Sequence, residues 1–100
     1  MQHIGVCRES ECGEMIAEFD VGGIDLRIVT EAPRSSSCLR FIDPYGDLVV
    51  NQLQLPVMIA ELEEMSRFTK DSEFQSNIAK LVQFLRESAD THVYVRFVGD

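Results

Sequence analysis

Two aspartates have the residue type and spacing for acid–base chemistry. Asp20 and Asp25 flank a Gly22-Gly23 pair, and apolar alternation on both sides of it predicts a hairpin that brings the carboxylates opposite each other. Facing carboxylates can raise one pKa and act as general acid and base, or bind a cation or a partner's basic side chain. Because both would lie beside a hairpin tip, a solvated pair is the favoured interpretation.

A second set of candidate binding residues lies near the end of the sequence. Residues 92–98 alternate with a period of two, which places His92, Tyr94 and Arg96 on one face of a strand. An imidazole, a phenol and a guanidinium together suit a ligand or a partner surface. The same residues also suit the ordinary polar side of a half-buried strand, in which Arg96 pairs with one of the many acids.

Other chemistry has weak support. Zinc accepts imidazole and thiolate ligands, and the sequence offers His3, Cys7, Cys12 and His92. However, His3 and Cys7 on one strand would be about 13 Å apart at roughly 3.3 Å per residue, too far to share an ion. The polar segment 34–37 could hold a phosphate or be phosphorylated. The sequence contains no Gly-rich phosphate loop, G-x-S-x-G, H-E-x-x-H or paired C-x2-C motif, so we expect no metal or other cofactor and favour a non-enzymatic protein.

The charge of the chain is acidic and unevenly spread. Nine basic and seventeen acidic residues give a formal net charge of −8 over 100 residues. Residues 9–31 hold seven of the acids and one base, Arg27. Such a field repels nucleic acid and anionic lipid and attracts basic partners. Three cysteines cannot all pair within one chain, which fits a reducing compartment. The sequence also has no long apolar run and no basic leader at its start, so we expect a cytoplasmic location.

The first half of the chain is predicted to be mostly strands. A short strand over 3–8 and a polar turn over 9–14 precede the hairpin of residues 15–21 and 24–30. A surface loop covers 31–37. A second hairpin then pairs strand 38–42 with strand 48–53 across the turn at 43–47, where Pro44 and Gly46 are typical turn residues.

The second half is predicted to contain two helices and a strand. Pro56 opens the first helix, whose apolar stripe has helical spacing. The second helix starts at Ser72, with Gln75 as a capping-box partner. Its apolar stripe contains Phe74, Ile78, Leu81, Val82, Leu85 and Ala89.

This order predicts a single α+β domain over residues 1–100. An antiparallel or mixed sheet of about five to six strands packs one face against two consecutive helices, and the C-terminal strand completes the sheet. Because that strand follows a helix, it could lie mid-sheet and parallel to a neighbour.

The second hairpin is apolar on both faces, which suggests a surface for association. We expect Ile42, Leu48 and Val50, extended by Ile16, Val29 and Val98, to form a patch on the sheet face opposite the helices. A second copy of the chain, a foreign protein or a loop of this chain would cover it, and homodimers are common in small domains.

Two functional hypotheses follow from these observations. The leading one is a small acidic protein-interaction module that self-associates and binds a basic protein. The alternative is a ligand-binding or catalytic domain that uses His92, Tyr94 and Arg96, with Asp20 or Asp25 nearby.

Overall fold

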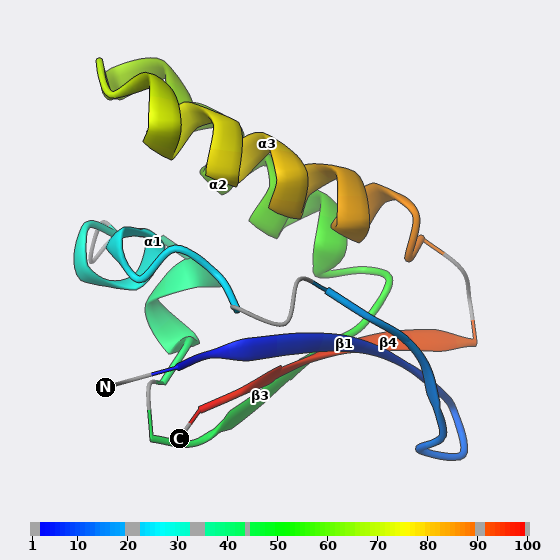
Figure 1. Ribbon diagram of the computed structural model, residues 1–100. Coiled ribbons are helices and arrows are strands. Elements are labelled where there is room, and N and C mark those ends of the chain that lie inside the picture. Colours follow the sequence, from blue (N-terminus) through cyan, green and yellow to red (C-terminus); the bar gives the residue numbers. More distant parts are fainter. Residues whose placement is uncertain (1–2, 20–22, 33–35, 44, 90–91, 100) are drawn as a thin grey trace.

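The computed structural model describes residues 3–19, 23–32, 36–43, 45–89 and 92–99 (Figure 1). Its elements, in chain order, are the strands β1 (Gly5–Ser10) and β2 (Met15–Glu18), the short helix α1 (Arg27–Thr30), the 3₁₀ helix η1 (Leu39–Phe41), strand β3 (Asp47–Val50), helices α2 (Leu55–Phe68) and α3 (Ser72–Arg86), and strand β4 (Val93–Val98). The strands form one sheet in the order β2-β1-β4-β3, and all three neighbouring pairs are antiparallel.

The α+β class, the two consecutive helices and the C-terminal strand are confirmed. Figure 1 shows α2 and α3 on one side of the sheet. The described residues form four strands, fewer than the five or six expected. Strand β4 is central, as considered above, but it is antiparallel to both of its neighbours.

Both long helices lie where their apolar periodicity predicts them. Helix α2 buries Leu55, Met58 and Leu62 and has a proline in its first turn. Helix α3 buries Phe74, Ile78, Leu81, Val82 and Leu85. Its N-cap is Asp71 rather than Ser72, since the Asp71 carboxylate accepts the backbone N–H groups of Glu73 and Phe74. Gln75 does not close a capping box there. Its side-chain amide donates to the carbonyls of Ser66 and Thr69 at the end of α2.

The core lies between these helices and one face of the sheet. The cross-strand pairs Val6–Phe97 and Val95–Val50 are buried on that face. Each buried large apolar side chain contributes about 1.5–3 kcal/mol relative to an exposed one. None of the described helices combines the length and apolar character needed to cross a membrane.

The predicted hairpin over residues 15–30 is wrong. Strand β2 turns back on β1, and Gly13, at φ +84°, lies in the turn between them. Gly23 also has a positive φ, +77°, but its role is close approach, because a Cβ there would lie 2.5 Å from the Ile4 carbonyl oxygen. The backbone N–H of Ile24 donates to that carbonyl. The glycine thus holds the chain against the start of β1 and does not turn a hairpin.

Residues predicted as the return strand of that hairpin contain helix α1. Ile28 in α1 and Ile24, three residues before α1, are both buried, so the alternating apolar pattern here does not require a strand. The Asp25 carboxylate accepts the backbone N–H of Arg27 at 3.0 Å, which favours the helical turn.

The predicted strand over residues 38–42 is also wrong. This segment contains η1, in which the Ser36 hydroxyl accepts the Arg40 backbone N–H. The predicted turn after η1 is present, and in it the Asp43 side chain accepts the backbone N–H of Tyr45 at 2.8 Å. Pro44 lies outside the described residues. The strand that follows, β3, pairs with β4 and not with the residues before the turn.

Candidate functional site

The sheet face that points away from α2 and α3 carries charged side chains, and we call it the open sheet face. Side chains alternate along a strand, so it contains the neighbours of the buried pairs. Cys7 on β1 lies opposite Arg96 on β4, and Arg96 lies opposite Val49 on β3. The side chains that the register places on this face are Cys7, Glu9, Met15, Glu18, Asp47, Val49, Tyr94, Arg96 and Val98.

Arg96 is the central charge of the open sheet face. Its Nε lies 3.0 Å from the Glu9 carboxylate and its Nη1 lies 3.2 Å from the Asp47 carboxylate. The hydrogen bond that Arg96 donates to Glu9 is the main cause that raises the pKa of Arg96. The guanidinium therefore joins three strands and is already balanced by two carboxylates.

The other two members of the predicted trio have acidic neighbours as well. Tyr94 is half-buried and lies opposite Glu9 in the β1–β4 register. The Nδ1 of His92 lies 3.0 Å from the Glu11 carboxylate. Tyr94 and Arg96 lie on the open sheet face, whereas His92 precedes β4. The surroundings of all three are acidic, which disfavours an anionic ligand.

The cysteines are free thiols, and the structure gives two of them no nucleophilic character. Cys7 and Cys38 are buried and Cys12 is exposed. Burial is the main cause that raises the pKa of both Cys7 and Cys38, with further contributions from nearby Glu9 and Glu61 respectively. Within the described residues, no three His, Cys, Asp or Glu side chains lie close enough together to hold a metal ion.

The hairpin of β1 and β2 gathers acidic and apolar side chains at an edge of the sheet. Glu11, Glu14 and Glu18 are exposed, and Met15 and Ile16 are 61% and 53% exposed. The register shifts between Arg8 and Glu9, so the β1–β2 pairing is irregular beside these apolar side chains. We call residues 9–18 the acidic hairpin. It belongs to the segment that the sequence identified as the source of most negative charge.

Asp25 does not form a carboxylate pair in the described structure, and Asp20 lies outside the described residues. The Asp25 side chain is only 11% exposed and is bound by Arg27 and by the Asn77 amide. Hydrogen bonding to Arg27 is the main cause that lowers the pKa of Asp25 to about 2. The carboxylate is thus an ionised structural group that ties α1 to α3.

The three residues predicted for self-association lie on the other side of the sheet from the position we expected. Ile42 and Val50 are buried in the core, and Leu48 packs against it opposite Phe97. Their apolar character reflects burial beneath the helices, because residues 38–42 form η1 and do not extend the sheet. Of the residues expected to extend the patch, Val29 packs against the core, whereas Ile16 and Val98 are exposed.

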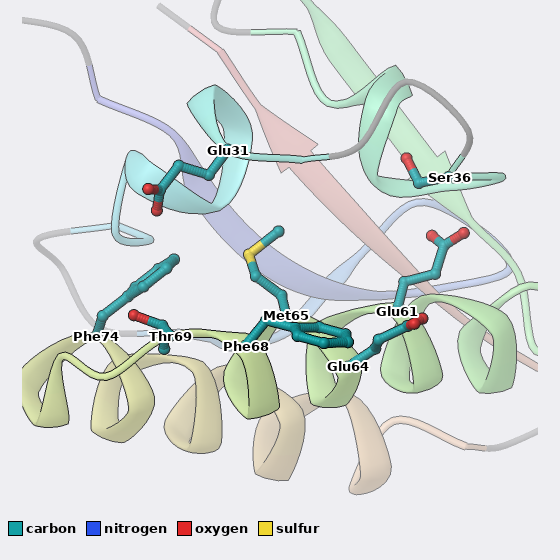
Figure 2. A pocket seen from close by; sticks show the side chains of 8 residues that line it. All are labelled: Glu31, Ser36, Glu61, Glu64, Met65, Phe68, Thr69 and Phe74. Carbon is teal, nitrogen blue, oxygen red and sulfur yellow. The ribbon is translucent and has the colours of Figure 1, made fainter.

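A groove of about 410 Å³ lies along the C-terminal half of α2 (Figure 2). We call it the α2 groove. Its acidic lining is Glu31, Glu61 and Glu64, and its apolar lining is Met65, Phe68 and Phe74. Sequence reasoning did not identify it, because Glu31 follows α1 and reaches the groove only through the tertiary fold. The sequence signal that points to the groove is Phe68, a large apolar residue outside the apolar stripe of α2. In the structure its side chain is 82% exposed.

One of the three carboxylates in the groove is already bound by backbone groups. Glu61 accepts the N–H groups of Ser37, Cys38 and Leu39, the last two at 3.0 and 3.1 Å. These three bonds anchor the start of η1 on α2. Glu61 therefore positions one wall of the groove.

Comparison with known proteins identifies no relative: no protein-family model, no curated protein and no solved structure matches this chain.

Proposed function

We propose that this chain is a non-enzymatic protein-interaction module that binds a basic protein partner through the acidic hairpin and the adjoining open sheet face. The observation that carries the proposal is the exposure of Met15 and Ile16 between the exposed carboxylates of Glu14 and Glu18. Exposed apolar side chains provide area to bury, and the carboxylates around them select a basic surface.

The position of β2 adds a second means of recognition. It is an edge strand of the sheet, so the backbone groups on its outer side can pair with an added strand. A partner strand with lysine or arginine on one face and apolar residues on the other would match both the backbone and the side chains of the hairpin.

Charge favours a basic partner over a second copy of the chain on the open sheet face. Glu9, Glu18 and Asp47 outnumber the single cation Arg96 on that face. Two copies packed through it would bring like charges together, which is destabilising. A second copy of the chain, bound through the exposed Val49 and Val98, is the other candidate occupant of this face. Its binding would require high salt to screen the repulsion.

The alternative of a small-ligand or catalytic site on β4 has less support. Such a site would use the guanidinium of Arg96, which two carboxylates already engage. The α2 groove, which has the volume of a ligand site, is lined by other residues.

An NMR titration of the protein at low salt with a peptide of alternating lysines and valines tests the proposal. We expect amide shifts concentrated in residues 9–18 and an association that weakens steeply as salt rises. The double variant Glu14→Lys, Glu18→Lys should bind about tenfold more weakly, which is roughly 1.4 kcal/mol.

The matched control changes the net charge by the same amount as the hairpin double variant, but outside the hairpin. Glu73→Lys with Glu87→Lys places the same charge change on or beside α3, where both residues are exposed. Equal losses in the two double variants would mean that only net charge acts, and would overturn the assignment to the hairpin. Light scattering over a hundredfold concentration range at low and high salt reports on self-association separately.

A further inference from the structure

The α2 groove is a binding site candidate that the proposed function does not use. It has a volume of about 410 Å³, within the usual range for small-molecule sites of roughly 300–1,000 Å³. Its lining comes from the residue after α1, the segment before η1, the second half of α2 with the residue after it, and the start of α3. The acidic hairpin is formed by β1 and β2. The two surfaces share no residues.

Two carboxylates in the groove have no partner within the described part of the chain. The side chains of Glu31 and Glu64 make no hydrogen bond or ion pair with any described residue, in contrast to Glu61 with its three N–H donors. In the view of Figure 2, Glu31 lies on one side of the groove and Glu64 on the other, with Met65 and Phe68 between them. The groove therefore offers negative charge on two sides of an apolar centre.

The aromatic ring at the groove adds an attraction for a cation. Phe68 is 82% exposed, so its ring is accessible to a ligand. Cations are attracted to the faces of aromatic rings. Phe74, which also lines the groove, shows this contact within the chain, with the Arg27 guanidinium 4.6 Å from its ring centroid. The accessible ring of Phe68 and the two carboxylates thus favour the same kind of ligand.

We propose that the α2 groove binds a free organic amine whose ammonium group meets Glu31 or Glu64 and whose apolar body packs on Met65 and Phe68. The ligand charge is set by complementarity, since the carboxylates would repel an anion and would form an ion pair with a cation but not with a neutral molecule. The apolar part is set by the side chains between them. This inference goes beyond the proposed function and does not depend on it.

The test is an NMR titration of the full chain with 2-phenylethylamine at pH 7 and low salt, with 2-phenylethanol as the neutral molecule of the same shape. We expect amide shifts at residues 31 and 61–69, and about fivefold tighter binding of the amine, as one partly exposed ion pair allows. Equal binding of amine and alcohol, or shifts confined to residues 9–18, would overturn the proposal.

Variants separate the groove from the general acidity of the chain. The double variant Glu31→Gln, Glu64→Gln should reduce amine binding to the level of the alcohol, and Phe68→Ala should weaken both molecules. Glu63→Gln is the matched control, because Glu63 is adjacent to Glu64 but pairs with Arg86 and does not line the groove. An equal loss in Glu63→Gln and Glu64→Gln would contradict the proposal. All these side chains are exposed, and unchanged spectra of the unliganded variants confirm folding.

Discussion

Arg27 contacts the carboxylate of Asp25 through two nitrogens, with Nε 3.0 Å from Oδ1 and Nη2 2.6 Å from Oδ2. The same guanidinium reaches Asp71, the N-cap of α3, at 2.9 Å. Asn77 on α3 completes the set by donating to Asp25. A short segment that the sequence suggested as a strand is thereby attached to the long helix that covers the sheet.

Replacing Asp25 tests whether this cluster stabilises the fold. Asp25→Asn removes the charge that Arg27 and Asn77 share, so we expect a loss of about 1–3 kcal/mol in the free energy of unfolding. Urea denaturation followed by circular dichroism measures it. Glu87→Gln is the control, since Glu87 is exposed and its bond with Gln83 is one that an amide can keep. A loss no larger in Asp25→Asn than in this control would contradict the role.

The same cluster predicts a pH dependence with a defined sign. The pKa of Asp25 is lowered from 3.8 to about 2, mainly by the hydrogen bond from Arg27. Stability from this ion pair is therefore present above pH 3.8 and is lost as the pH falls from 3.8 to about 2, by about 2 kcal/mol in total. The difference in stability between the wild type and Asp25→Asn should shrink over this window. A constant difference down to pH 2 would refute the assignment.

The burial pattern of α2 predicts opposite outcomes for two leucines. Leu62 is fully buried and Leu53, just before α2, is 77% exposed. Leu62→Ala should cost about 2–5 kcal/mol in the free energy of unfolding because it leaves a cavity beneath the helix. Leu53→Ala should change it by about 0.5 kcal/mol or less. Thermal or urea denaturation distinguishes them, and similar losses in both variants would contradict the position of α2.

Glu61 is expected to hold the segment that leads into η1. Removing its carboxylate in Glu61→Ala leaves three backbone N–H groups without their acceptor, so the amides of residues 37–39 should exchange with solvent about tenfold faster or more. Hydrogen exchange followed by NMR measures this. Glu63→Ala, which removes an exposed partner of Arg86, should leave those three amides unchanged.

Local periodicity determined the two long helices and the last strand. The apolar residues of α2 and α3 recur every three or four positions over 14 and 15 residues, and that spacing fits only a helix with one buried face. The alternation in residues 92–98 likewise identified β4. In these segments the information is carried within the element itself.

Short apolar runs were ambiguous because two structures bury them equally well. The spacing of Ile24 and Ile28 fits a two-residue alternation and also a helical turn. In the structure Ile28 lies in α1, Ile24 precedes it, and both are buried in the core. Gly13 and Gly23 both permit a positive φ, but only the first lies in a hairpin turn. The nearness of the Ile4 carbonyl, which decides the role of Gly23, is a contact between segments about twenty residues apart.

Local sequence patterns were sufficient to predict the fold class, the two helices and the location of negative charge in residues 9–31. Tertiary structure alone decided which strands pair, since β3 joins β4 from more than forty residues away, and therefore which apolar residues are buried. It also decided that Arg96 lies between Glu9 and Asp47 and that Glu31 and Glu64 line one groove. Such sites depend on distances between segments, and a periodic pattern within one segment carries no information about those distances.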